Sequence, residues 1–204
     1  MANTINYHKE LIRVLDNAPK DKLPTVLLHS CCAPCSSYCL EFLSTRALVT
    51  VFYYNPNITS KDEYEYRLSE QKRLIEAMDF VNPVKLIPGS YEPEKFLEMA
   101  KGLEDAPERG PRCVNCYTMR LKETARVAGE QGFDYFATTL TLSPLKPSDV
   151  INRIGLELES KAVYLPSDFK KNNGYLRSIE LSKQYNLYRQ NYCGCVYSKR
   201  CTEN

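Results

Sequence analysis

Short apolar runs alternate along the chain with longer segments in which apolar residues recur every three or four positions. The short runs are rich in β-branched and aromatic residues, which is typical of buried strands. We predict strands over residues 25–29, 48–54, 84–87, 135–139 and 163–165. We predict helices over residues 5–17, from after Cys35 to about 45, 60–78, 93–101, 112–131, 147–160 and 174–185.

Strands that alternate with helices are typical of right-handed βαβ units. We therefore predict an α/β fold, a single domain over residues 1–204 with a mostly parallel five-stranded sheet covered by helices on both faces. No repeat, low-complexity segment or internal linker divides the sequence. No apolar run approaches the roughly 20 residues that span a bilayer. The first residues show no export signal, so we expect a cytoplasmic protein that does not contact a membrane.

The formal net charge is only +2, but it is unevenly distributed. Residues 161–204 carry eight Lys and Arg against three acidic residues, whereas residues 1–160 are net negative. The same C-terminal portion, which we assign to the same domain, holds six tyrosines. Basic side chains among aromatic ones neutralise phosphates and stack unpaired bases. The alternative is an ordinary solvated surface above tyrosines of the core.

Nine cysteines stand in three groups, and clustered thiols in a reducing compartment indicate metal or redox chemistry. The groups are Cys31, Cys32, Cys35 and Cys39; Cys113 and Cys116; and Cys193, Cys195 and Cys201. The first group follows the first predicted strand, and the second begins the helix that leads to the fourth. Because ligands bind beyond the carboxyl ends of parallel strands, we expect the two groups to meet at one rim of the sheet.

The adjacent pair Cys31 and Cys32 is the unusual feature of this set. Neighbouring residues of a strand point to opposite sides, so the pair does not suit a single tetrahedral zinc. Spacing alone leaves open two metals at one rim, a cysteine that takes part in chemistry, a zinc site formed by Cys32, Cys35, Cys113 and Cys116, an iron–sulfur cluster, unligated thiols or a thiol–disulfide pair. It does not separate iron from zinc.

The third group allows several interpretations. Cys193 and Cys195 flank a glycine, which permits the tight turn that would bring two thiols together. They can form a redox-active pair, supply further ligands or form a wall of the pocket. Cys39 and Cys201 are interpreted as bystanders.

Polar residues outside the cysteine groups give further candidates. The turn after the first strand has no glycine, which excludes a dinucleotide fingerprint and a P-loop. His29 ends that strand beside the thiols, where it can handle protons or support a metal ligand. Arginines 109, 112 and 120 surround the second cysteine pair and can hold phosphates, stabilise an anionic cluster or simply be solvated.

Two loops on the same predicted rim offer further polar groups. After the fourth strand come Thr138, Thr139, Ser143 and Lys146, which suit a polar substrate or a phosphate but can also cap the next helix. After the fifth strand comes Asp168, whose carboxylate can ligate a metal or move a proton, or can belong to a surface turn.

Five motifs, taken in order, resemble those of the QueH-type epoxyqueuosine reductases. They are Cys31-Cys-Ala-Pro-Cys35, Arg112-Cys-Val-Asn-Cys-Tyr117, Thr138-Thr-Leu-Thr-Leu-Ser-Pro-Leu-Lys146, Asp168-Phe-Lys-Lys171 with Gly174-Tyr175, and Arg189-Gln-Asn-Tyr-Cys-Gly-Cys195. The resemblance implies a fold like that of the adenine-nucleotide α-hydrolase (HUP) group. It also implies the final step of queuosine biosynthesis, the cobalamin-independent reductive deoxygenation of epoxyqueuosine to queuosine at the wobble position of tRNA.

The resemblance further implies a 4Fe-4S cluster with a nearby mononuclear iron. Carried over to this sequence, the metal ligands are Cys31, Cys32, Cys113, Cys116 and, as our choice of carboxylate, Asp168. The residues that match the family without an assigned role are Cys35, Cys193 and Cys195. The residues expected to bind substrate or the anticodon stem-loop of tRNA are Thr138, Thr139, Ser143, Lys146, Lys170, Lys171, Tyr175, Arg177 and Arg189.

The implied partners are tRNA that bears epoxyqueuosine and a one-electron donor such as a ferredoxin or flavodoxin. Two other hypotheses remain at this point. One is a different tRNA-modifying enzyme on the same fold, although the nucleotide-binding Ser-Gly-Gly loop that it needs is missing. The other is a non-catalytic zinc-binding RNA module.

Overall fold

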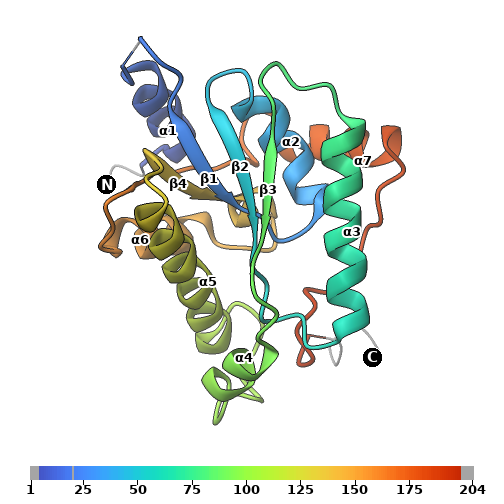
Figure 1. Cartoon of the computed structure of the whole chain (residues 1–204). Coiled ribbons are helices and arrows are strands. Elements are labelled where there is room, and N and C mark those ends of the chain that lie inside the picture. Colours follow the sequence, from blue (N-terminus) through green and yellow to red (C-terminus); the bar gives the residue numbers. More distant parts are fainter. Residues whose placement is uncertain (1–4, 20, 199–204) are drawn as a thin grey trace.

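Five parallel strands form the centre of the computed structural model, which describes residues 5–19 and 21–198 (Figure 1). Their order across the sheet is β3-β2-β1-β4-β5, and every neighbouring pair is parallel. The strands are β1 (Thr25–His29), β2 (Leu48–Tyr53), β3 (Lys85–Pro88), β4 (Tyr135–Thr138) and β5 (Val163–Tyr164). The predicted α/β class is confirmed, with a sheet that is entirely parallel.

Helices cover both faces of this sheet, as predicted. One face carries α1 (Tyr7–Asp16), α2 (Ala33–Leu43), α3 (Lys61–Ala77) and α7 (Gly174–Gln184), and the other carries α5 (Pro111–Glu130) and α6 (Ser148–Glu157). The short helix α4 (Pro93–Met99) lies beyond the carboxyl ends of the strands, beside the start of α5 (Figure 1).

The two cores follow from the alternation of side chains along β1. Val26 and Leu28 point into the core beneath α2, whereas Leu27 points into the core beneath α5, and all three are fully buried. Because each such side chain contributes about 1.5–3 kcal/mol when it is buried, a strand apolar on both sides suits the centre of a sheet covered on both faces.

Three local predictions were inaccurate. Helix α2 begins at Ala33 rather than after Cys35, because Pro34 at the start of the helix has a backbone angle suited to its first turn. A 3₁₀ helix, Thr139–Leu142, follows β4 where we predicted a loop, and Thr138 caps it through its side chain. The first helix begins at Tyr7, not at residue 5 as predicted, and Ile5 precedes it and is exposed.

A segment that we name the C-terminal strap, residues 185–195, runs along α3 toward the carboxyl ends of the strands (Figure 1). Arg73 of α3 donates hydrogen bonds to the carbonyls of Tyr185 and Asn186, each at 2.9 Å. Glu70 accepts one from the backbone N–H of Tyr188 at 2.9 Å. These contacts hold the strap so that Cys193 and Cys195 lie at the end of the sheet where the other thiols lie. Cys201 lies outside the described residues.

Within the described part of the chain, no helix combines the length and the apolar character that crossing a membrane requires.

Candidate functional site

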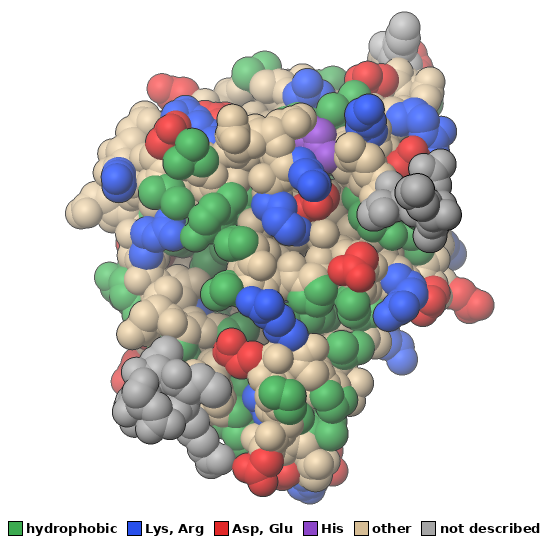
Figure 2. All heavy atoms as spheres, turned by 180° about the vertical axis from the view of Figure 1, so that it is seen from behind, with side chains coloured by type: hydrophobic (Ala, Val, Ile, Leu, Met, Phe, Trp, Pro, Cys, Tyr) green, Lys and Arg blue, Asp and Glu red, His purple; other side chains and the backbone are tan. Residues whose placement is uncertain are grey.

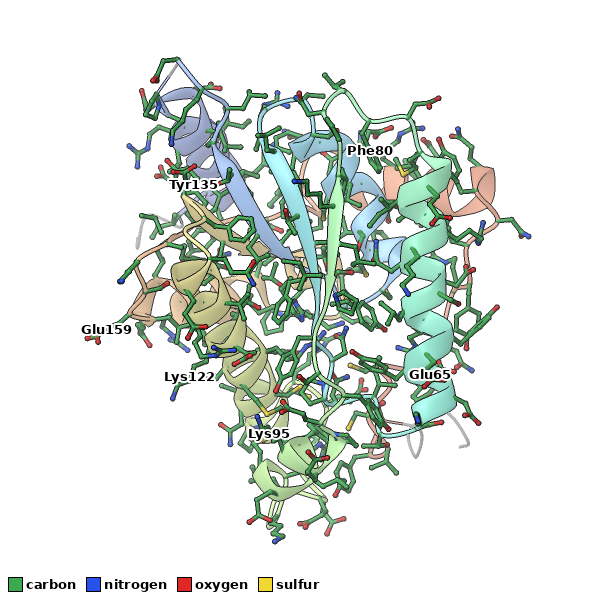
Figure 3. The ribbon with its side chains drawn as sticks, in the orientation of Figure 1. Glu65, Phe80, Lys95, Lys122, Tyr135 and Glu159 are labelled. Atoms are coloured by element: carbon green, nitrogen blue, oxygen red, sulfur yellow. The ribbon has the colours of Figure 1, made fainter. Side chains whose placement is uncertain are left out.

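A pocket of about 440 Å³ opens at the carboxyl ends of β1 and β4. The order of the sheet reverses between these two strands, and ligands bind at such a switch point in open parallel sheets. Seven of the eight described cysteines line this pocket, all except the fully buried Cys39. Figure 3 shows several sulfur atoms at this end of the sheet, far from the labelled Tyr135 at the start of β4, and another near the labelled Phe80 at the opposite end.

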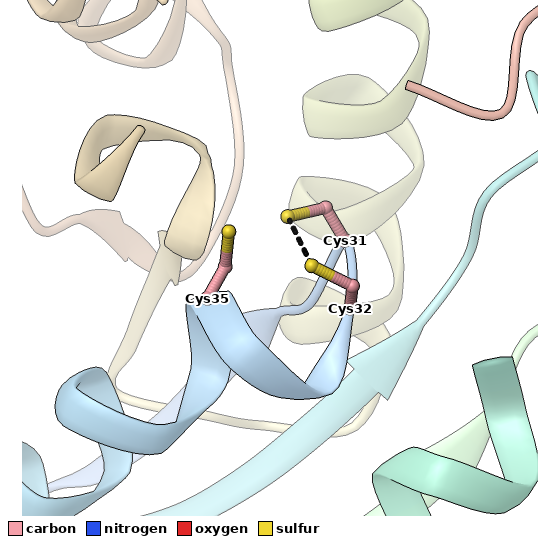
Figure 4. A group of neighbouring side chains, drawn as sticks. All are labelled: Cys31, Cys32 and Cys35. Carbon is pink, nitrogen blue, oxygen red and sulfur yellow. Dashed lines mark hydrogen bonds between the residues drawn. The ribbon is translucent and has the colours of Figure 1, made fainter. Parts of the chain in front are cut away.

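Three of these thiols come from the turn between β1 and α2. The Sγ atoms of Cys31, Cys32 and Cys35 lie within 4.8 Å of one another, and those of the adjacent pair are 3.8 Å apart (Figure 4). Our expectation that the adjacent pair would diverge was wrong, because the chain leaves the strand there. Cys32 is the N-cap of α2, so the turn brings the sulfurs together and places Cys35 in the first helical turn.

The three thiols differ in how readily they ionise. Hydrogen bonds from Cys32 and Cys35 hold the pKa of Cys31 well below its usual range, even though burial opposes this. The hydrogen bond with Cys31 raises the pKa of Cys32 to about 12, and hydrogen bonds with Cys31 and Cys32 raise that of Cys35. Thr139 adds a further donor, since its Oγ1 lies 3.4 Å from the Cys31 sulfur. The arrangement favours the thiolate at Cys31 over those at its two neighbours, and the thiolate is the form that binds metal.

The remaining four thiols come from two other parts of the chain. Cys113 and Cys116 lie in the first two turns of α5, and burial raises the pKa of Cys116 to about 12. Cys195 packs beside Cys116 in a small cluster with Phe96 of α4. The backbone carbonyl of Cys193 accepts a hydrogen bond from the amide of Asn57 at 3.2 Å. The strap therefore places Cys193 and Cys195 in the wall of the pocket, one of the alternatives that the sequence left open.

The floor of the pocket contains a buried polar network. Arg120 donates from Nε to Nε2 of His29 at 3.2 Å and from Nη2 to Oδ1 of Asn55 at 2.5 Å. Nδ1 of His29 lies 2.9 Å from Oγ1 of Thr138. Burial, and secondarily the Arg120 charge, lowers the pKa of His29 to about 3. His29 is thus uncharged near pH 7, and both of its ring nitrogens are engaged in hydrogen bonds that hold the floor of the pocket.

Four residues predicted to bind substrate line the pocket, namely Ser143, Lys146, Tyr175 and Arg189. Burial alone would lower the pKa of Lys146, but the sulfurs of Cys193, Cys31 and Cys35 outweigh it and raise that pKa above its ordinary value. The ammonium group is therefore retained. The hydroxyl oxygen of Thr139 accepts a hydrogen bond from the backbone N–H of Cys31 at 3.2 Å, so Thr139 supports the turn that carries the thiols.

The other predicted residues are engaged elsewhere and do not line the pocket. The carboxylate of Asp168, the expected metal ligand, forms an ion pair of 2.7 Å with Lys170 and is only 7% exposed. Arg177 is paired with carboxylates of Glu41 and Glu180 at 2.7 and 3.1 Å. Lys171 is exposed.

Sequence reasoning missed Arg67 of α3, which lines the pocket and is 2% exposed. It pairs with Glu63 at 2.6 Å and donates to the carbonyls of Cys193 and Tyr192 at 3.3 and 3.4 Å. The i,i+4 spacing from Glu63 was the only local signal, and it is common on exposed helices. Arg112, by contrast, donates from Nη1 to the carbonyls of Leu103, Glu104 and Ala106, so it shapes a loop.

The parallel sheet and its pocket define a Rossmann-like α/β protein with a thiol-rich site at the topological switch point. Comparison with known proteins identifies the family: the family model of epoxyqueuosine reductase QueH matches residues 26–201. The chain therefore belongs to the epoxyqueuosine reductase QueH family, as the motifs predicted.

Curated relatives support this assignment across most of the chain. The epoxyqueuosine reductase QueH of Staphylococcus epidermidis is 47% identical over 203 residues, which cover 95% of this chain and 84% of the relative. That of Streptococcus pyogenes serotype M1 is 43% identical over 201 residues, with 96% and 79% covered. That of Thermotoga maritima is 37% identical over 182 residues, with 85% and 90% covered.

Proposed function

We propose that this protein is an epoxyqueuosine reductase that acts on tRNA. It removes the epoxide oxygen of epoxyqueuosine at the wobble position and leaves the alkene of queuosine, the final step of queuosine biosynthesis. The observation that carries the proposal is the convergence of seven thiols on one pocket in a chain of the QueH family. We further propose that the protein acts in the cytoplasm and that residues 1–204 form a single domain.

The donor set fits an iron–sulfur centre, because thiolates are the ligands of such clusters and three sulfurs already lie within 4.8 Å of one another. We assign Cys31, Cys32, Cys113 and Cys116 to a 4Fe-4S cluster, and Cys35, the third member of the triad, to a nearby mononuclear iron. For Asp168 to ligate that iron, its ion pair with Lys170 would have to open, so Cys35 is the better candidate. When bound, these groups supply electrons singly and a Lewis acid for the epoxide oxygen.

Conversion of an epoxide to an alkene consumes two electrons and two protons and releases water. We therefore include a one-electron donor of the ferredoxin or flavodoxin class, and no cobalamin. Of the protein's own residues, Lys146 places a cation in the pocket beside Ser143, where it binds an anionic or strongly polar part of the substrate. The buried walls exclude water from the reacting carbons.

We assign binding of the anticodon stem-loop to the residues at the rim of the pocket. Tyr175 and Leu145 are 36% and 62% exposed there, and they offer surfaces against which splayed bases can pack. Arg189 supplies charge for phosphates. Figure 2 shows one face of the molecule, on which basic side chains are interspersed with acidic and hydrophobic ones. Lys170 and Lys171 lie outside the pocket and would contact the flanking stem.

The test is an anaerobic preparation in which iron and sulfide are counted and conversion of epoxyqueuosine in tRNA is followed with a chemical reductant, with and without added cobalamin. We expect iron, sulfide and cobalamin-independent turnover, all lost in Cys32→Ser, Cys113→Ser and Cys116→Ser. The matched control is Cys39→Ala, which removes a buried thiol outside the pocket and should retain iron. A colourless protein that holds zinc, or one that binds ATP, would support the alternative hypotheses instead.

A further inference from the structure

Arg120 is a buried charge whose hydrogen bonds are only partly satisfied. The side chain is 1% exposed, yet it lines the thiol pocket. His29 and Asn55 occupy its Nε and Nη2 nitrogens, as described above. Nη1 has no hydrogen-bond partner within the described part of the chain. A guanidinium carries five N–H groups in a rigid fork, so fixing two of its nitrogens also fixes the direction of the third.

The positive charge of Arg120 also lacks a carboxylate. Within residues 5–19 and 21–198, no ion pair joins Arg120 to an Asp or Glu, whereas the similarly buried Arg67 is paired with Glu63 at 2.6 Å. An unpaired charge in a protein interior costs several kcal/mol. The groups that hold Arg120, a neutral imidazole and an amide, add no negative charge. The compensating anion must therefore come from the pocket.

The nearest candidates for that anion are sulfurs. Cys116 precedes Arg120 by one turn of α5 and shares its face of the helix. Burial by itself would lower the pKa of Arg120, but Cys116, Cys31 and Cys193 together raise it above its ordinary value. These three cysteines belong to three different segments and line the same pocket as Arg120, so the guanidinium lies in the field of thiols from all three.

We propose that Arg120 is a positioning residue that donates hydrogen bonds from Nη1 to the anionic metal–thiolate group at the floor of the pocket and balances its charge. This inference deepens the proposed function and rests on it for the nature of the occupant. Four thiolates carry more negative charge than the ion or cluster they surround, so a buried cation favours the loaded site. It also favours the reduced state of an iron–sulfur centre, because reduction adds one more negative charge.

The test is a thermodynamic cycle between substitution and metal loading. Thermal unfolding is measured for wild type and Arg120→Gln, each metal-free and each reconstituted with ferrous iron and sulfide. A merely structural Arg120 lowers the Tm equally in both states, because the bonds to His29 and Asn55 are lost in both. We expect instead that Arg120→Gln lowers the Tm of the loaded protein much more than that of the metal-free protein, with Arg120→Lys in between.

The matched control is Arg126→Gln, which alters another arginine of α5 that does not line the pocket. Its charge is already balanced by Glu123 and Glu130, so we expect the same Tm loss in both states. A second measurement is the midpoint potential of the cluster, which should become more negative in Arg120→Gln. Equal Tm losses in the two states together with an unchanged potential would overturn the inference, even if wild type reduces epoxyqueuosine.

Failure of the proposed function gives a different result. A wild-type protein that binds zinc but no iron–sulfur centre refutes the iron chemistry, yet the cycle can be repeated with zinc, whose four-thiolate complex is also anionic. A larger Tm loss in the zinc-loaded state would then support the role of Arg120 alone. A wild-type protein that binds neither metal overturns both proposals.

Discussion

Substitution of Arg67 by methionine tests whether α3 holds the C-terminal strap against the pocket. Methionine keeps the apolar length of the side chain but removes the ion pair with Glu63 and the hydrogen bonds to the carbonyls of Tyr192 and Cys193. It also removes a cation–π contact, with the guanidinium carbon 5.1 Å from the ring of Tyr192. The strap should detach more often, and with it the two thiols that it carries.

The magnitude follows from the burial of the pair. Removing one partner of a buried ion pair costs about 3–5 kcal/mol. Glu63 retains 18% exposure and a hydrogen bond from the hydroxyl of Tyr188, so its carboxylate is partly compensated and the low end applies. A cost of about 3 kcal/mol corresponds to a roughly 150-fold increase in the opening equilibrium of the strap.

The assay is hydrogen exchange of backbone amides, read separately for residues 185–195 and for β1. We expect faster exchange in the strap and little change in β1. Arg126→Met is the matched control: Arg126 also pairs with two carboxylates but is 52% exposed, so its loss should cost less than about 1 kcal/mol. Unchanged exchange in the strap, or equal acceleration in β1, would refute the idea that Arg67 holds this segment.

Three further predictions concern other parts of the molecule. Gly194→Ala should destabilise the strap by about 2–4 kcal/mol, because φ at this residue is +97° and the new Cβ would lie 2.7 Å from an isoleucine side chain. The iron content of the protein should fall as a result. Urea unfolding and iron analysis check the two effects. Hydrogen bonds from the backbone N–H and the hydroxyl of Thr25 lower the pKa of Asp134. The contribution of this carboxylate to folding stability is therefore present above about pH 3.9 and is lost as the pH falls through the folded pKa. Asp134→Asn should thus be less stable at pH 7, by at most about 1 kcal/mol because the carboxylate is 36% exposed, and this difference should shrink progressively in urea titrations as the pH falls below about 3.9. Arg177→Ala should change tRNA affinity in filter-binding assays much less than Lys146→Ala, because Arg177 is already neutralised by two carboxylates; equal losses would contradict this.

Much of the fold could be predicted because its signals are local. Val26, Leu27 and Leu28 give the run Thr25–His29 apolar side chains on both sides, as a strand covered on both faces needs, and its predicted bounds match β1. Ser60 caps α3 through its side chain as its position predicted. The segment after β4 was harder to predict. Its 3₁₀ helix is capped by the side chain of Thr138, and over so few residues an ordinary loop fits the sequence equally well.

The candidate site was predictable in its ingredients but not in its arrangement. Spacing placed the first two cysteine groups at one rim because carboxyl ends of parallel strands share an edge. It mispredicted the adjacent pair Cys31 and Cys32, whose convergence depends on where the strand ends and α2 begins. The family resemblance also suggested roles for Asp168 and Arg177, whose side chains the structure shows in ion pairs with Lys170 and Glu41.

The sequence by itself determined the parallel α/β class, the family and the supply of thiols, because periodicity and motifs are written in neighbouring residues. Only the tertiary structure decided which thiols share a pocket, that the strap brings Cys193 and Cys195 to it, and that Arg67 and Arg120 are buried beneath it. Burial and charge compensation depend on residues far apart in the chain. Within the described residues no carboxylate pairs with Arg120. The role of its charge can therefore be inferred only from the thiols that three separate segments bring to the pocket.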